Sequence, residues 1–201
     1  PPTAIAFGAI GRMNRDKGIV DLLLAFERVA QKTPNVRLLL VGDFEAGDPL
    51  PAAIRQQIAT DDRIVQTGFV TDPAPYYYAM DALVHASLRE GFPNVVLEAA
   101  AAELPTIGRQ VTGVVDAIVD GNTGLVVDPI GPLPLAEAMQ LYAADEPLRK
   151  KHGRAGRRRV ESEFARESIW DDLAELYGEL LAAKSLPLPT AMSDEANLAA
   201  A

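Results

Sequence analysis

Two glutamates, Glu90 and Glu98, stand with seven residues between them and bracket the turn Gly91-Phe92-Pro93-Asn94. An apolar run at residues 81–85 precedes the turn and predicts a buried strand, and an Ala- and Leu-rich run after it predicts a helix. Because proline suits the first helical position and asparagine suits a cap, the helix should open at Pro93 or Asn94. Two carboxylates would then flank a helix N-terminus, whose free N–H groups attract an anion.

Spacing alone leaves a plainer interpretation of these residues open. Glu90 could serve only as a partner of the helix dipole, and Glu98 could be a solvated helix residue. His85 ends the predicted strand just before the loop that carries Glu90. A lone histidine in such a position is more often a packing or hydrogen-bonding residue than a catalyst.

A second candidate is the loop at residues 11–18, which follows an apolar run and precedes a helical spacing of apolar residues from Ile19 onward. Its glycines allow close backbone approach, and it carries three cations, among them Arg12 and Lys17. The order of strand, basic glycine-rich loop and helix binds phosphate in many α/β folds. The loop matches neither Walker A nor G-x-G-x-x-G, so a surface loop with solvated cations stays an open alternative.

Strands alternate with helices along the chain, and no hairpin signal is present. This order predicts an α/β fold, a doubly wound parallel sheet of about six strands that is Rossmann-like. Such sheets bind ligands at the carboxyl ends of their strands, where the loops after the first, fourth and fifth strands would meet. We expect one domain over residues 1–183 and a disordered tail over 184–201, where Pro, Ser and Ala dominate without periodicity.

Composition excludes several classes of function. The chain has 201 residues, a formal net charge of -9, no cysteine and two histidines. The lack of cysteine excludes disulfides, thiolate metal sites and cysteine nucleophiles, and two histidines argue against a histidine-based zinc site. The acidic balance argues against a nucleic-acid-binding surface. The basic run at residues 150–159 predicts a solvated helix face, with docking on an anionic membrane as the alternative.

Several motifs together resemble those of one enzyme family. Ser87, Gly-Phe-Pro-Asn and Glu98-Ala-x-Ala, arranged around Glu90, resemble the donor-site motif of retaining glycosyltransferases of family 4, which have the two-domain GT-B fold. Gly11-Arg12 with Lys17-Gly18, and Gly68-Phe69-Val70, resemble further motifs of that family. The resemblance covers residues 5–164 and implies the C-terminal, donor-binding half of a GT-B fold.

The resemblance implies a role for each matched segment. Arg12 and Lys17 would grip the diphosphate of a nucleotide sugar, Glu90 would contact the sugar hydroxyls, and Glu98 would accept hydrogen bonds from the ribose. The helix N-terminus would face the diphosphate, and the Gly68-Phe69-Val70 turn would lie against the base, although a plain strand end is the alternative there. The implied catalytic residues are Arg12, Lys17 and Glu90; the implied donor-binding residues are Gly11, Arg12, Lys17, Gly68, Phe69, Val70, Glu90, Gly91, Phe92, Pro93, Asn94, Val95 and Glu98.

Three positions depart from the family pattern. Phe44 stands where relatives have the second glycine of Val-Gly-x-Gly, and Glu103 stands where they have a glycine that ends a helix. A left-handed Glu103 would cost roughly 1–2 kcal/mol. Thr112-Gly113 and Asp116 replace the two glycines and the glutamate of a loop that faces the donor sugar in relatives.

The resemblance therefore implies a retaining glycosyltransferase that takes a nucleotide sugar, with a UDP-linked N-acetylhexosamine as the expected donor, and extends a bacterial glycan or a lipid-linked saccharide. We expect no metal and no cofactor, because the sequence has no Asp-x-Asp motif and two cations can stabilise a diphosphate. The expected partner is a missing N-terminal acceptor-binding domain, so this chain alone should be inactive. The expected location is cytoplasmic, peripheral at the inner face of the membrane. The alternatives are another GT-B enzyme, such as a nucleotide-sugar epimerase, and a non-catalytic nucleotide-binding module.

Overall fold

The computed structural model describes residues 4–186, in which strands alternate with helices from the first strand to the sixth. The strands are β1 (Ile5–Ile10), β2 (Val36–Val41), β3 (Ile64–Gln66), β4 (Ala82–His85), β5 (Thr106–Arg109) and β6 (Gly124–Val127). The helices are α1 (Ile19–Lys32), α2 (Ala52–Thr60), α3 (Ala74–Tyr77), α4 (Asn94–Ala101), α5 (Val114–Ala117), α6 (Leu133–Ala144), α7 (Glu146–Glu163) and α8 (Arg166–Ala183).

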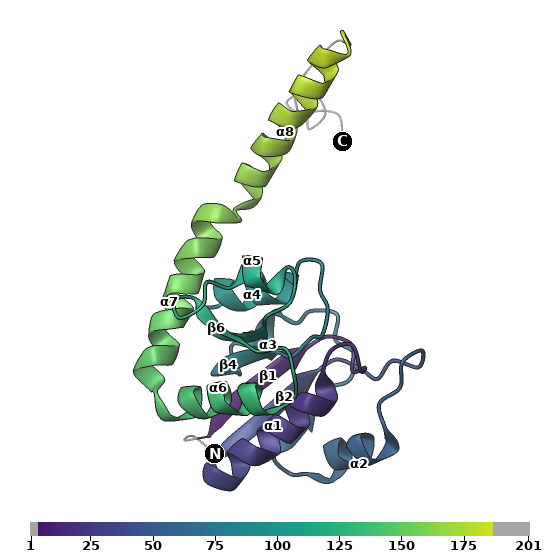
Figure 1. Ribbon diagram of the computed structural model, residues 1–201, viewed down its shortest axis with the longest axis vertical. Helices are drawn as coiled ribbons and strands as arrows, with labels where there is room; N and C mark the ends of the chain where they lie inside the picture. Colours follow the sequence, from purple (N-terminus) through teal and green to yellow (C-terminus); the bar gives the residue numbers. More distant parts are fainter. Residues whose placement is uncertain (1–3, 187–201) are drawn as a thin grey trace, which may run out of the picture. The chain divides into compact units, whose positions relative to one another are not determined.

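All six strands form one parallel sheet in the order β3-β2-β1-β4-β5-β6 (Figure 1). The chain winds outward from β1 to β3 and then returns to add β4 on the other side of β1. Strand order therefore reverses between β1 and β4, which is the point where doubly wound sheets bind ligands. The prediction of a six-stranded, doubly wound, Rossmann-like sheet is confirmed.

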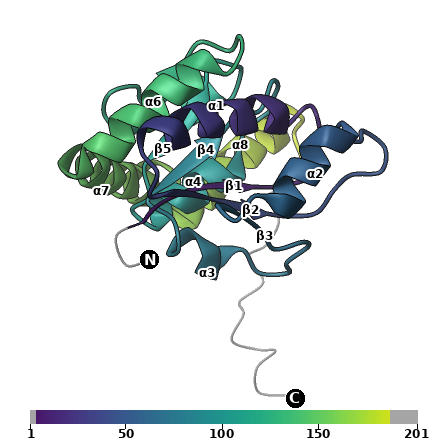
Figure 2. The same ribbon diagram turned by 90° about the horizontal axis from the view of Figure 1, so that it is seen from below.

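Helices cover both faces of the sheet. One buried apolar cluster joins the sheet to α1 and α6, and a second joins it to α3, α4 and α5. Figure 2 shows α1 and α6 on one side of the sheet and α3 on the other. In α1, apolar residues recur every three or four positions, so Leu22, Phe26 and Val29 all lie in the first cluster.

The start of α4 is one of the two expected positions, although the residue at the cap differs from the expected one. The helix begins at Asn94, so asparagine is its first helical residue and not its cap. Pro93 takes the cap position in an extended conformation, with φ −86° and ψ 94°, and no side chain caps the helix. The N-terminus of α4 therefore keeps its first-turn N–H groups without a capping side chain, as an anion site would need.

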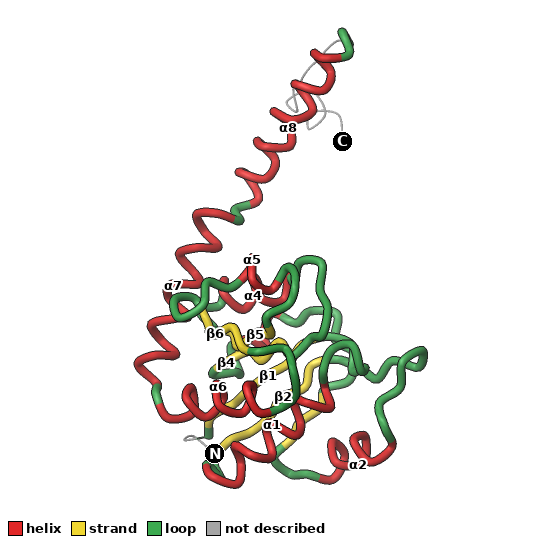
Figure 3. The backbone as a smooth tube through the Cα atoms, in the orientation of Figure 1, coloured by secondary structure: helices red, strands yellow, loops and turns green. Residues whose placement is uncertain are grey.

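Two short segments follow strands of the sheet. β3 ends at Gln66, and Gly68 after it has a left-handed φ of +71° and forms an isolated bridge with Gly42. The predicted glycine-rich loop after β5 instead contains one helical turn, α5, at Val114–Ala117. Figure 3 shows α5 as a short helical turn beside α4.

Glu103 has the left-handed conformation expected for a glycine at the end of a helix, with φ 58°. The Leu104 N–H donates to the Ala99 carbonyl at 2.9 Å, and the Glu103 N–H donates to the Ala100 carbonyl at 3.0 Å. These two bonds close α4 with a Schellman motif. Glu103 therefore takes the left-handed conformation, with a strain of roughly 1–2 kcal/mol.

The basic run on α7 is partly structural. Arg157 donates to the Ala101 carbonyl at the end of α4, and Arg159 donates to the Ala117 carbonyl at the end of α5 at 2.9 Å. Cations suit helix C-termini because the helix dipole is negative there. Arg154 and Arg158 are exposed on α7, in line with a solvated face.

The chain divides into two compact units, residues 1–161 and 162–201. In the second unit α8 exposes apolar side chains, among them Trp170 and Tyr177. Most of the predicted disordered tail lies outside the described residues, so the tail and the boundary at 183 stay predictions. Among residues 4–186, every helix is too short or too polar to traverse a lipid bilayer.

Candidate functional site

Three loops meet at the carboxyl ends of β1, β4 and β5, as predicted. A Cβ atom on Gly18 would lie 2.0 Å from the Ala86 carbonyl oxygen, and a Cβ atom on Gly113 would lie 1.8 Å from the Gly91 carbonyl oxygen. Both positions therefore need glycine, because any larger residue would push the loops apart. The Leu88 N–H also donates to the Asp16 carbonyl at 2.8 Å and joins the first loop to the second.

Glu90 is the centre of a polar cluster at this junction. Its carboxylate forms an ion pair with the Lys17 ammonium, and its Oε1 atom lies 3.1 Å from Nε2 of His85. Ser87 is a further hydrogen-bonding partner. The His85 side chain is 6% exposed and that of Glu90 is 14% exposed, so water screens their contact weakly.

These partners lower the pKa of Glu90 from its ordinary value of 4.5 to about 2. The contact with His85 is the largest cause, and hydrogen bonds from Lys17 and Ser87 add to it against the cost of burial. Nε2 of His85 is buried 3.1 Å from Oε1 of Glu90, and in the described part of the chain it has no partner in good hydrogen-bond geometry. Glu90 is therefore ionised at neutral pH.

Arg12 also has a carboxylate partner in the structure. Its Nη1 atom lies 2.6 Å from Oε1 of Glu45, and the other oxygen of Glu45 accepts a hydrogen bond from the Asn14 amide at 2.5 Å. Asn14 in turn accepts the backbone N–H of Lys17 at 2.9 Å. A continuous network thus joins the two predicted phosphate-binding cations to two glutamates.

Sequence reasoning missed Glu45 and Asn14. Glu45 belongs to the loop after β2, which packs beside the loop after β1 because the two strands are neighbours. Met13 and Phe44 form a short bridge between those loops. The strand order of a doubly wound fold could have identified the loop, but no local pattern could have identified the ion pair across 33 positions.

A cavity of about 490 Å³ lies at the ends of β1, β2 and β3. Its lining is mostly apolar and includes three charged residues, Arg12, Asp43 and Glu45. The lining residues are Ile10, Gly11, Arg12, Val41, Gly42, Asp43, Phe44, Glu45, Ala46, Phe69, Val70 and Pro73. The structure thus brings the predicted Gly11, Arg12, Phe69 and Val70 to one cavity, and Phe44 supplies an aromatic wall where relatives have glycine.

The structure places Glu98 in different surroundings from Glu90. Its Oε2 atom accepts a hydrogen bond from the Tyr77 hydroxyl at 2.6 Å. Glu98 and Tyr77 line a separate cavity of about 380 Å³, and Pro73 lines both this cavity and the larger one. Burial and the Glu98 carboxylate raise the pKa of Tyr77, so the phenol stays protonated and remains a donor.

The remaining predicted residues form the start of α4. Gly91, Phe92 and Asn94 are exposed, Val95 is half-buried, and Pro93 is buried. Gly91 also supports the loop after β5 through its close approach to Gly113.

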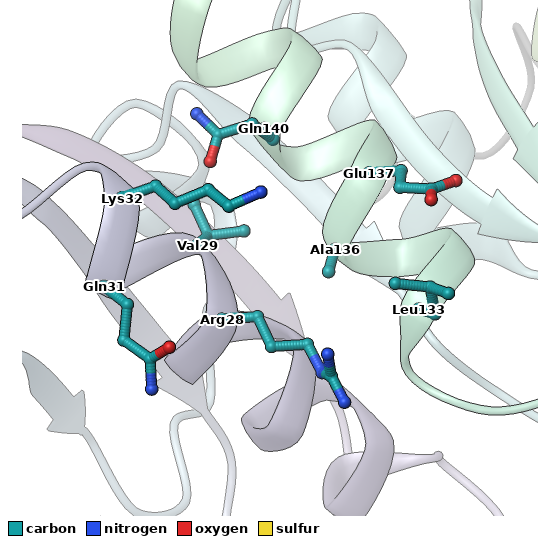
Figure 4. A pocket seen from close by; sticks show the side chains of 8 residues that line it. All are labelled: Arg28, Val29, Gln31, Lys32, Leu133, Ala136, Glu137 and Gln140. Atoms are coloured by element: carbon teal, nitrogen blue, oxygen red, sulfur yellow. The ribbon is translucent and has the colours of Figure 1, made fainter.

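Another cavity, of about 330 Å³, lies between α1 and α6 and contains none of the predicted residues (Figure 4). Figure 4 shows Arg28 and Lys32 on the α1 side and Glu137 on the α6 side. Within the described ranges, no group of three or more His, Asp or Glu side chains is arranged to hold a metal ion.

Comparisons with known proteins show what the chain is similar to. The family described as "Glycosyl transferases group 1" matches residues 4–145. The capsular polysaccharide biosynthesis glycosyltransferase CapM of Staphylococcus aureus is 36% identical over 174 residues, which are 87% of this chain and 46% of CapM. The chain thus spans about half the length of this curated relative.

Solved structures share the fold. The C-terminal domain of a glycosyl transferase group 1 family protein, LpcC of Francisella tularensis, is 26% identical with a TM-score of 0.73, over 81% of this chain and 87% of that domain. Anabaena Alr3699/HepE in complex with UDP-glucose is 24% identical with a TM-score of 0.79, over 88% of this chain and 49% of HepE, and at this identity shows the fold alone. With the family match over most of its length and the fold of a C-terminal GT-B domain, this chain belongs to the glycosyl transferases group 1 family.

Proposed function

We propose that this chain is the donor-binding half of a retaining glycosyltransferase that uses a nucleotide sugar. The observation that carries the proposal is the network Arg12–Glu45–Asn14–Lys17–Glu90, which runs from the apolar cavity to the start of α4. It begins at Arg12, which lines a cavity of suitable size for a base, and ends on the ionised carboxylate of Glu90, which pairs with Lys17.

Each part of a nucleotide sugar has a partner in this arrangement. The base occupies the cavity between Phe44 and the Phe69-Val70 turn, and the diphosphate binds Arg12 and Lys17. Both cations are paired with carboxylates in the ligand-free chain, so the diphosphate takes their place as the stronger anion. Glu90 then accepts hydrogen bonds from the sugar hydroxyls, and Glu98 turns from Tyr77 to the ribose.

The proposed chemistry is electrostatic. As the sugar leaves, negative charge grows on the diphosphate, and Arg12, Lys17 and the N-terminus of α4 stabilise it. Arg12, Lys17 and Glu90 are thus the proposed catalytic residues. No metal or other cofactor is needed, because the two cations supply the positive charge.

The names of the relatives support a choice of donor and acceptor. CapM is named for capsular polysaccharide biosynthesis, which supports a bacterial glycan or lipid-linked acceptor. HepE has been solved with UDP-glucose, so UDP-linked sugars, with an N-acetylhexosamine as our choice, are the first ligands to try. The acceptor half is supplied by an N-terminal domain that this chain lacks, and the complete protein works in the cytoplasm at the inner face of the membrane.

A thermal-shift panel of uridine, UDP, GDP, ADP and their sugar conjugates tests the proposal. We expect one base to raise the melting temperature of the chain at millimolar ligand, and EDTA at constant ionic strength to leave that rise unchanged. We also expect no sugar transfer by this chain alone. If no nucleotide raises the melting temperature, the donor-binding proposal is wrong.

A further inference from the structure

His85 is a buried polar residue to which the proposed donor site assigns no role. It is the last residue of β4, and its Nε2 atom is buried 3.1 Å from Oε1 of Glu90. In the described chain no other contact satisfies this atom. A buried imidazole nitrogen that faces a carboxylate indicates more than packing, because an apolar side chain would fill the same space at a lower desolvation cost.

The two nitrogen-bearing partners of Glu90, Lys17 and His85, differ in how firmly they are held. Lys17 lies on a loop, has four rotatable bonds, and its side chain is 26% exposed. His85 lies in a strand with all four of its residues buried, and its side chain has two rotatable bonds. Lys17 is also the ammonium that the diphosphate would draw away from Glu90. When Lys17 turns to the diphosphate, His85 and Ser87 are the partners that Glu90 keeps.

We propose that His85 is a positioning residue that holds the Glu90 carboxylate in place for the donor sugar while Lys17 engages the diphosphate. The inference rests on the proposed function and deepens it. It distinguishes Glu90, which contacts the sugar, from His85, which holds the Glu90 carboxylate in place. His85 can donate from Nε2 both as the cation and as the Nε2–H tautomer, so the support does not require a charged imidazole.

The contact between the two residues also predicts an effect in the absence of ligand. His85, Lys17 and Ser87 are the groups that face the Glu90 carboxylate, and His85 makes the largest contribution to its low pKa. Removal of the imidazole should therefore raise the pKa of Glu90 toward its ordinary value, whereas Lys17 alone would keep it only partly lowered. Carbon-13 NMR of labelled glutamate carboxyls follows this titration, with the Glu90 signal assigned by its absence in Glu90→Gln.

The ligand experiment uses calorimetry to compare the affinities of UDP-N-acetylglucosamine and UDP. If the thermal-shift panel selects another base, the sugar conjugate and the diphosphate of that base take their place. The ratio of the two affinities reports the contribution of the sugar. We expect Glu90→Gln to lower this ratio about tenfold, and His85→Phe to lower it about fivefold with little change in UDP affinity. His85→Gln, whose amide nitrogen can replace Nε2, should keep the ratio within about twofold of the wild type.

Controls separate positioning from a general loss of structure. Thr106→Val removes another buried polar group, on β5, and should leave the ratio and the Glu90 titration unchanged. His85→Leu replaces His85→Phe if phenylalanine prevents folding. If the His85 variants bind UDP but leave both the ratio and the Glu90 titration as in the wild type, the inference is overturned. If the wild type binds no nucleotide, the proposed function fails instead.

Discussion

Arg12 shares its guanidinium with Glu45, although the guanidinium is largely exposed and could reach a ligand. A nucleotide diphosphate must compete with this internal carboxylate for the same donors. Glu45→Gln keeps the shape of the side chain and removes its charge, so Arg12 should be more available and the affinity for UDP should rise about three- to tenfold. Calorimetry measures the change.

Glu137→Gln is the matched control for this charge change, because Glu137 lines the cavity between α1 and α6. It should leave the affinity for UDP unchanged. If Glu45→Gln lowers the affinity for UDP, Glu45 helps to bind the ligand, and the proposed competition between Glu45 and the diphosphate is wrong.

The ionised Glu90 carboxylate gives the chain a pH-dependent stability. The folded state lowers its pKa to about 2, so the stabilisation is complete above pH 4.5 and is lost as pH falls toward 2. The shift corresponds to at most about 3 kcal/mol. Glu90→Gln should therefore lower the free energy of unfolding most at pH 6, and its difference from the wild type should shrink by pH 3. Urea unfolding at both pH values measures this; a difference that stays constant would contradict the low pKa.

At the scale of the element, the strain at Glu103 gives a prediction about α4. Glycine adopts the left-handed conformation without strain. It also gives the unfolded chain more conformational freedom, which offsets part of the gain in stability. Glu103→Gly should raise the free energy of unfolding by roughly 0.5–1 kcal/mol. Ala102→Gly is the control, since Ala102 has a φ of −90° and should lose stability on the same change. Equal effects of the two changes in urea unfolding would contradict the strain.

Sequence periodicity predicted the elements with a strong apolar pattern. α1 begins at Ile19 and β2 runs over Val36–Val41, as expected, because their buried faces recur with the period of a helix and of a strand. It failed at α5, where Gly113 and a single helical turn give too few residues for a pattern. Local propensity left Pro93 and Asn94 as alternative starts of α4, because it cannot choose between two adjacent residues; the structure starts the helix at Asn94 with Pro93 at the cap.

The same limit applies to the site. Strand order brings Lys17, Glu90 and Arg12 to one sheet edge, and this could be predicted from the alternation of strands and helices. The partners that neutralise these residues, Glu45 and His85, depend on side-chain contacts between separate loops. Motifs pointed to the residues proposed to contact a ligand, Arg12, Lys17 and Glu90. They could not point to Glu45 and His85, which contact those residues from other parts of the chain.

At the scale of the whole molecule, the chain is half of the length of CapM and matches nearly all of the LpcC C-terminal domain. Every predicted site residue lies in the unit of residues 1–161. Under the proposed function, a donor site carried by one domain binds its nucleotide without the acceptor half, so binding by this chain can be measured separately from transfer.

The central claim is that this chain holds a nucleotide diphosphate through Lys17. Calorimetry of UDP and uridine, or of the diphosphate and nucleoside of the base that the panel selects, tests it with the wild type, Lys17→Ala and Lys32→Ala. Loss of a hydrogen bond to a charged group typically costs about 1.5–3 kcal/mol, which is roughly ten- to a hundredfold in affinity. We predict such a loss for UDP in Lys17→Ala, little change for uridine, and no change for either ligand in Lys32→Ala, whose lysine lines the other cavity. Equal effects of Lys17→Ala on UDP and uridine, or no binding of either ligand to the wild type, would contradict the account.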